Sequence, residues 1–155
     1  VTNKEQPELI SRKTYSGSRY AHQSWLSTDQ KYLFFGDELD EYYYGNKSKT
    51  YVFDLSELDR PILHHSYLGT TYAIDHNGYV VEDLYYLSNY TAGLRVINIK
   101  EISNKEMEEV MYFDTYVFND DTTFNGVWNV YPFFKSGVIA ISDSQEGLFL
   151  VKPTL

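Results

Sequence analysis

The sequence predicts an all-β fold, and two observations support this prediction: a composition that favours strands, and a strand pattern that recurs along the chain. Of 155 residues, 17% are aromatic and 16 are tyrosine. Aromatic residues favour pleated sheet over helix. The best helix candidate, residues 103–109, is short and polar, so we expect at most one helical turn there. A chain of this length matches one domain.

The recurring pattern begins at His22, His76 and Trp128, which follow one another at intervals of roughly fifty residues, as propeller repeats do. Each of these residues opens a short strand that is followed by others, separated by turn residues. The expected strands are 22–26, 32–35, 50–55 and 61–69 in the first unit, 76–81, 84–87, 94–99 and 109–116 in the second, and 128–133, 137–141 and 148–151 in the third.

Four short antiparallel strands in each repeat are typical of β-propeller blades. The units 21–70, 71–118 and 119–155 would be three blades, of which the last has three strands. Residues 1–20 hold a segment that resembles the fourth strands, and we expect it to close an outer edge. Three blades do not close a ring, so we expect part of a larger propeller of about six to eight blades. The alternative is an ordinary β-sandwich with coincidental periodicity.

Composition excludes several function classes. The formal net charge of −9 argues against nucleic acid or anionic membranes as partners. The chain has no cysteine, so disulfides and thiolate metal sites are excluded. No apolar run reaches the roughly 18 residues of a membrane span. The sequence has no nucleophile elbow, phosphate-binding glycine loop or His-Glu-x-x-His motif.

Distinctive strings occur in every repeat, and together they resemble the choice-of-anchor B family. The resemblance implies a secreted or surface-anchored β-propeller of LVIVD-type repeats, of which this chain would be the carboxy-terminal half. It implies little about activity. The strings are Ala21–Leu26, Gly36–Glu41, Ala73–Asn77, Asn89–Val96, Phe113–Tyr116, Phe124–Trp128, Tyr131–Phe134 and Gly147–Val151.

The repeat places His22 and His76 at equivalent positions, so both should face one central channel. Asp75 precedes His76, and Asp37 with Glu38 follows the second strand. Imidazoles and carboxylates that converge in this way can bind zinc or manganese. The alternative is structural, with both histidines hydrogen-bonded to neighbouring backbone.

The acidic loop 37–41 offers a dense group of carboxylate oxygens, which suits calcium. The alternative is a solvated acidic loop. Asn89 and Asp143 recur at the position of Asp37. A repeated Asp or Asn there suggests that the side chain caps the following turn through bonds to the backbone.

Other residues are candidates for a binding surface. Tyr42, Tyr43 and Tyr44 form the expected exposed patch, and with Trp128 they could stack on sugar rings or on a partner's side chains. Arg95 interrupts an apolar strand and is expected to point outward more readily than to pair with a carboxylate. The triplets that begin at Asn46 and Asn89 are possible glycosylation sites.

Two functions from different classes follow. The leading one is a secreted or cell-surface scaffold, not catalytic, that binds another macromolecule or a glycan. Its partners would also include other blades of the same precursor or a second chain. The alternative is a metal-dependent enzyme whose channel site is built on His22 and His76.

Overall fold

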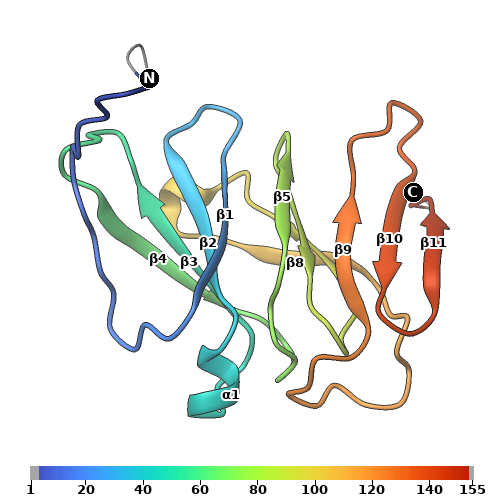
Figure 1. Ribbon diagram of the computed structural model, residues 1–155. Helices are drawn as coiled ribbons and strands as arrows, with labels where there is room; N and C mark the ends of the chain where they lie inside the picture. Colours follow the sequence, from blue (N-terminus) through green and yellow to red (C-terminus); the bar gives the residue numbers. More distant parts are fainter. Residues whose placement is uncertain (1–3, 154–155) are drawn as a thin grey trace.

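The computed structural model describes residues 4–153 and consists of three antiparallel β-sheets (Figure 1). Each sheet is a simple meander, because the strands pair in chain order. Sheet 1 contains β1 (Ala21–Leu26), β2 (Tyr32–Asp37), β3 (Lys49–Asp54) and β4 (Ile62–Leu68). Sheet 2 contains β5 (Gly78–Val81), β6 (Leu84–Ser88), β7 (Leu94–Asn98) and β8 (Glu108–Phe113). Sheet 3 contains β9 (Val127–Tyr131), β10 (Ile139–Asp143) and β11 (Gly147–Val151).

Sheet 2 lies between the other two sheets, so both of its faces are covered (Figure 1). The first strands meet along one side, where β1 contacts β5 and β5 contacts β9. Strand β7 shows why the sheets stack. Its alternating residues Leu94 and Val96 pack with sheet 3, while Ile97 packs with sheet 1. A strand that is buried on both faces must be apolar on both, and β7 is buried from Leu94 to Ile97.

Two apolar cores join the three sheets. Between sheets 1 and 2, the rings of Phe34 and Tyr85 stack with centroids 5.1 Å apart. Between sheets 2 and 3, Val127 and Ile141 are fully buried. These cores hold the first strands in fixed relation to one another. The buried members of the first core are Phe34, Val52, Val80, Tyr85, Leu87, Ile97, Ile99 and Ile102, and those of the second are Leu94, Val96, Val127, Val130, Ile139 and Ile141.

The all-β prediction is confirmed, and every expected strand of the three repeats overlaps an observed one. The described residues form three sheets, not the two of a sandwich, and they form no closed ring. One boundary matters for function. Strand β5 begins at Gly78, so His76 and Asn77 lie in the segment that leads into the strand.

The helical residues do not lie where the sequence predicted them. A short helix, α1 (Asp40–Tyr44), forms within the acidic loop and ends at Gly45, whose φ of 63° is left-handed. A 3-10 turn covers Ile102–Asn104, so the expected turn within 103–109 is displaced toward its start. The loop prediction for residues 37–41 is wrong at Asp40 and Glu41, because carboxylates in the first turn favour a helix amino terminus.

The prediction of a closing outer strand in residues 1–20 is also wrong. The described part of that segment before Ala21 forms no strand. It crosses the outer face of sheet 1, where the Tyr15 ring packs on Phe35 and Tyr51. Sheet 1 is at one end of the molecule and sheet 3 at the other (Figure 1), so the described segment lies away from the edge of sheet 3. Apolar packing of Tyr15 takes the place of strand pairing.

Two equivalent glycine turns allow a matched test of how closely the backbone packs at Gly93. Gly93 and Gly147 precede or open the third strands of sheets 2 and 3 with φ of 80° and 87°. A Cβ on Gly93 would lie 2.3 Å from the Phe113 carbonyl oxygen, whereas one on Gly147 would meet nothing within 4 Å. Gly147→Ala should therefore cost about 1–2 kcal/mol of backbone strain, and Gly93→Ala clearly more. Urea unfolding measures the loss of unfolding free energy in both variants. Equal losses would contradict the close approach of the Phe113 carbonyl to Gly93.

Candidate functional site

Three potential ligand side chains meet where sheet 1 contacts sheet 2. His22 lies on β1, Glu38 follows β2, and His76 precedes β5. One ligand atom from each residue lies within 4.8 Å of the others. Their elements are far apart in sequence, so the stacking of the two sheets creates the cluster. We call His22, Glu38 and His76 the histidine–glutamate site.

The Glu38 carboxylate contacts both imidazoles, with one oxygen near each ring. Its Oε2 is 3.4 Å from His22 Nδ1, and its Oε1 is 3.5 Å from His76 Nε2. The two imidazole rings stack with centroids 4.2 Å apart and an interplanar angle of 26°. His76 and Glu38 are 2% and 12% exposed, while His22 is 23% exposed, so the site opens on the His22 side.

A backbone carbonyl fixes the tautomer of His76. Its Nδ1 is 2.6 Å from the oxygen of Trp128, and a carbonyl can only accept, so Nδ1 carries the proton. Burial lowers the pKa of His76, as does the nearby His22, although the Trp128 carbonyl and Glu38 oppose the shift. In the neutral ring the unprotonated Nε2 therefore faces a carboxylate oxygen. Two acceptors face each other there.

Tyr90 orients the Glu38 carboxylate through a hydrogen bond. Its hydroxyl donates to Glu38 Oε1 over 2.7 Å, and its side chain is buried. Burial, the hydrogen bond and the Glu38 charge all raise the pKa of Tyr90, so the phenol remains a donor. The Tyr90 carbonyl also accepts from Val127 N over 3.0 Å, which connects this support to sheet 3. A hydrogen-bonded second layer of this kind is typical of metal sites.

Aromatic rings border the open side of the site. The ring of Trp128, half exposed, lies 4.5 Å from that of His76, and Tyr20 stacks on His22 at 6.0 Å. Phe124 contacts Tyr90. The roles of the Tyr90 hydroxyl and the Trp128 carbonyl could not be predicted from the sequence, because neither contact follows from spacing alone.

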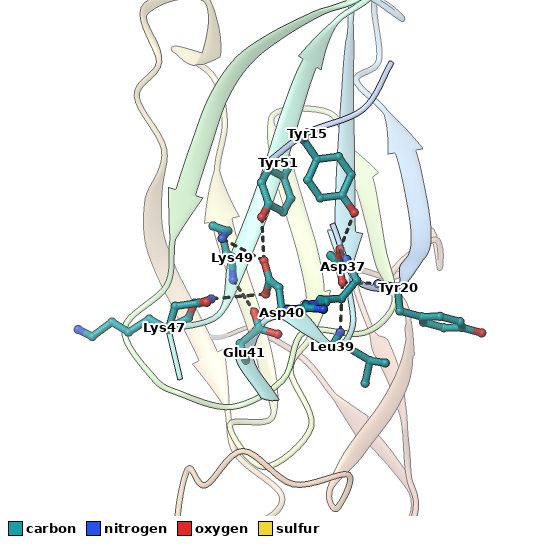
Figure 2. A network of polar contacts seen from close by, with 11 residues as sticks. Tyr15, Tyr20, Asp37, Leu39, Asp40, Glu41, Lys47, Lys49 and Tyr51 are labelled. Atoms are coloured by element: carbon teal, nitrogen blue, oxygen red, sulfur yellow. Dashed lines mark hydrogen bonds and ion pairs between the residues drawn. The ribbon is translucent and has the colours of Figure 1, made fainter. Parts of the chain in front are cut away.

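Asp37 was expected near the histidines, but its carboxylate is occupied elsewhere. It accepts from the hydroxyl of Tyr15 and from the backbone N–H groups of Arg19 and Tyr20 (Figure 2). Asp75 was also expected there, but it is not among the residues that converge with the histidines. Asp75 is fully buried instead between the sheets. The structure therefore brings neither Asp37 nor Asp75 to the two histidines.

The recurring position of Asp37, Asn89 and Asp143 has a structural role that spacing only partly predicts. Asp143 caps its own turn by accepting from the N–H groups of Gln145 and Glu146. Asp37 and Asn89 bind the backbone that leads into the first strand of their own sheet, and Asp37 also accepts from the Leu39 N–H in its own turn, over 3.4 Å. Asn89 donates to two carbonyls there, those of residues 73 and 74.

The rest of the acidic loop is buried, not solvated. Asp40 accepts from Tyr51 and forms an ion pair with Lys49 over 3.0 Å (Figure 2). Glu41 Oε1 accepts from the Lys49 backbone N–H. Burial is the largest cause that raises the pKa of Glu41, to about 11, and the charges of Asp75 and Asp40 add to it.

The surface candidates divide into exposed and buried residues. Tyr42, Tyr43 and Tyr44 on α1 are exposed, and so is Trp128. Arg95 is buried, so its prediction as a surface residue is wrong. Its guanidinium donates to the Ala92 carbonyl and to the Glu109 carboxylate. The negative charge of Glu109 compensates the positive charge of Arg95 within the sheet.

The two glycosylation candidates differ as well. Asn89 is 2% exposed, and its side-chain amide nitrogen donates hydrogen bonds to two backbone carbonyls, so a glycan cannot attach in this fold. Asn46 is partly exposed, and its glycosylation stays a prediction.

A scan against protein-family models and a search of curated proteins found no match. No helix in the described part of the chain is both long and apolar enough to span a membrane.

The buried carboxyl of Glu41 predicts a pH dependence of stability. The folded state retains a proton that the unfolded state loses above about pH 4.5. Stability from this group is therefore complete below that pH and declines as pH rises, by up to about 1.4 kcal/mol per unit. In metal-free buffer, Glu41→Gln should flatten the slope of unfolding free energy between pH 5 and 8, measured by urea unfolding.

An exposed carboxyl provides the control. Glu106→Gln should leave the wild-type slope unchanged, because Glu106 is exposed on a loop. Parallel slopes for wild type and Glu41→Gln would contradict the assignment of a proton to Glu41.

Proposed function

We propose that this protein binds a divalent transition-metal ion at the histidine–glutamate site. The observation that carries the proposal is the pair of facing acceptors. In the neutral imidazole, whose Nδ1 donates to Trp128, His76 Nε2 has no proton, yet it faces Glu38 Oε1 at 3.5 Å. A cation between these atoms replaces their repulsion with attraction on both sides.

The spacing of the donor atoms suits a zinc-sized ion. Zinc lies about 2.0–2.1 Å from imidazole nitrogen and about 2.0–2.2 Å from carboxylate oxygen, so tetrahedral ligands are about 3.3–3.5 Å apart. The His22–Glu38 Oε2 and His76–Glu38 Oε1 separations are 3.4 and 3.5 Å, and one ligand atom from each of the three residues lies within 4.8 Å of the others. Two histidines and one carboxylate also leave a fourth position open, as in catalytic zinc sites. Water activation for hydrolysis is the reaction class that such a centre supports.

Isothermal titration with Zn²⁺ tests the proposal. Wild type should bind one equivalent, and His22→Ala, His76→Ala or Glu38→Gln should each weaken binding by about 100-fold or more. Tyr90→Phe removes only the hydrogen bond to Glu38, so it should cost about 10- to 100-fold.

The control is a histidine outside the site. His65 lies on β4, and His65→Ala should keep wild-type affinity. If His22→Ala combined with His76→Ala binds zinc as wild type does, the ion is elsewhere and the proposal fails.

A second candidate function is a surface-exposed scaffold. We propose that the three sheets are consecutive blades of a larger propeller of the choice-of-anchor B type, placed outside the cell, which binds further blades or a second chain. The supporting observation is the free face of sheet 3. Leu148 and Leu150 are 70% and 65% exposed, while their neighbours Phe149 and Val151 face the second core. A sheet that is apolar on both faces indicates a missing neighbour.

Sedimentation measurements test this candidate. Wild type should self-associate with rising concentration, because the free face of sheet 3 has no cover, and Leu148→Ser with Leu150→Ser should abolish the effect. Val117→Ser changes a residue that is equally exposed but outside the strands, and it should not. A wild type that stays monomeric throughout would contradict the candidate.

A further inference from the structure

A second group of acidic residues lies inside the protein, apart from the histidine–glutamate site. Asp75 is completely buried, and neither of its carboxylate oxygens has a hydrogen-bond partner within the described residues. Glu41 is also completely buried, and its Oε2 lacks a partner there. A buried carboxylate without partners costs several kcal/mol, so these oxygens require an explanation.

The unpartnered oxygens belong to one locality between sheets 1 and 2. A Cβ on Gly36 would lie 2.8 Å from Asp75 Oδ2, so Asp75 lies directly against β2. Gly36 pairs across the sheet with Thr50, whose buried Oγ1 has no hydrogen-bond partner within 3.5 Å but interacts with the side chain of Tyr85. Glu41 reaches the neighbouring residue of β3, because its Oε1 accepts from Lys49 N. Asp75 is also the strongest charge acting on Glu41.

The local charges do not balance. Asp37 and Asp40 have partners, as Figure 2 shows for the Tyr15, Tyr51 and Lys49 contacts. The Lys49 ammonium is paired with Asp40, 3.0 Å away. No ion pair of the described residues involves Asp75 or Glu41. Lys49 is the cation that acts on Asp75, but it forms its ion pair with Asp40, so negative charge on Asp75 and Glu41 has no ion-pair partner among the described residues.

We propose that Asp75, Glu41 and Thr50 form a buried calcium-binding site that joins sheet 1 to sheet 2. The donors are all oxygens, which calcium and magnesium prefer. Calcium is favoured because it accepts irregular geometry, whereas magnesium requires a near-ideal octahedron. The absence of a nitrogen donor separates this site from the histidine–glutamate site, whose two imidazoles suit zinc.

The alternative is a pair of protonated acids. Burial raises the pKa of both Asp75 and Glu41, which keeps them neutral when no cation is bound. The two explanations predict opposite responses to calcium. A bound ion would stabilise the folded state and depend on both carboxylates, whereas protonated acids would make Asn and Gln nearly neutral replacements.

The test is thermal unfolding after refolding with calcium chloride or with a chelator, since the site is closed in the folded protein. Calcium at 100-fold above its dissociation constant should raise the wild-type Tm by about 5–10 °C. Asp75→Asn and Glu41→Gln should each abolish the rise. Elemental analysis of the refolded, dialysed wild type should find one calcium per chain. Terbium, refolded in place of calcium, should show luminescence sensitised by the nearby Tyr85 and Tyr51.

Two controls separate the sites. The His22→Ala, His76→Ala double variant should keep the full calcium response, and so should Glu106→Gln. A wild-type Tm that calcium does not change would overturn the proposal, as would an undiminished response in Asp75→Asn or in Glu41→Gln. If Asp75→Asn does not fold, the Glu41→Gln response and the calcium content of wild type still decide the matter. Loss of the response only in the histidine variant would assign the ion to the histidine–glutamate site, which also overturns it.

Discussion

The burial of sheet 2 between its two neighbours is the constraint on which the rest of the structure depends. The stack of Phe34 on Tyr85 and the apolar alternation of β7 hold sheet 1 at a fixed position on sheet 2. That position brings β1 beside β5, and with them His22 and His76. Without this packing, the two imidazoles would belong to separate elements with nothing to bring them together.

The same interface concentrates acidic groups in a protein with a net charge of −9. Apolar burial near 25 cal/mol per Å² supplies stability across the interface, and unpartnered carboxylates oppose it. The structure offsets part of this cost through Lys49 at Asp40 and through donors at Asp37. Glu38 accepts a hydrogen bond from the neutral Tyr90 hydroxyl. Neither oxygen of Asp75 has a hydrogen-bond donor among the described residues. Cations at both places would resolve the imbalance, which is why two metal proposals arise from one interface.

Repetition made the fold readable from the sequence. The roughly fifty-residue interval located all three sheets and placed His22 and His76 together, because equivalent positions of stacked repeats are neighbours. The sequence indicated both Asp37 and Glu38, but it could not show that Asp37 turns toward the backbone of Arg19 and Tyr20, which leaves Glu38 beside the histidines. Adjacent residues on a strand end point in opposite directions, and their spacing does not reveal which one faces the site. Arg95 and Asn89 were misjudged because polarity suggested exposure, whereas local backbone acceptors satisfy both side chains in the interior.

Anomalous X-ray scattering at the zinc absorption edge, from crystals grown with zinc, tests the central claim most directly. The stacking of sheets 1 and 2 predicts one strong peak about 2.0–2.2 Å from a ring nitrogen of each of His22 and His76 and from a carboxylate oxygen of Glu38. A peak at other residues, or histidines too far apart to share one ion, would contradict it.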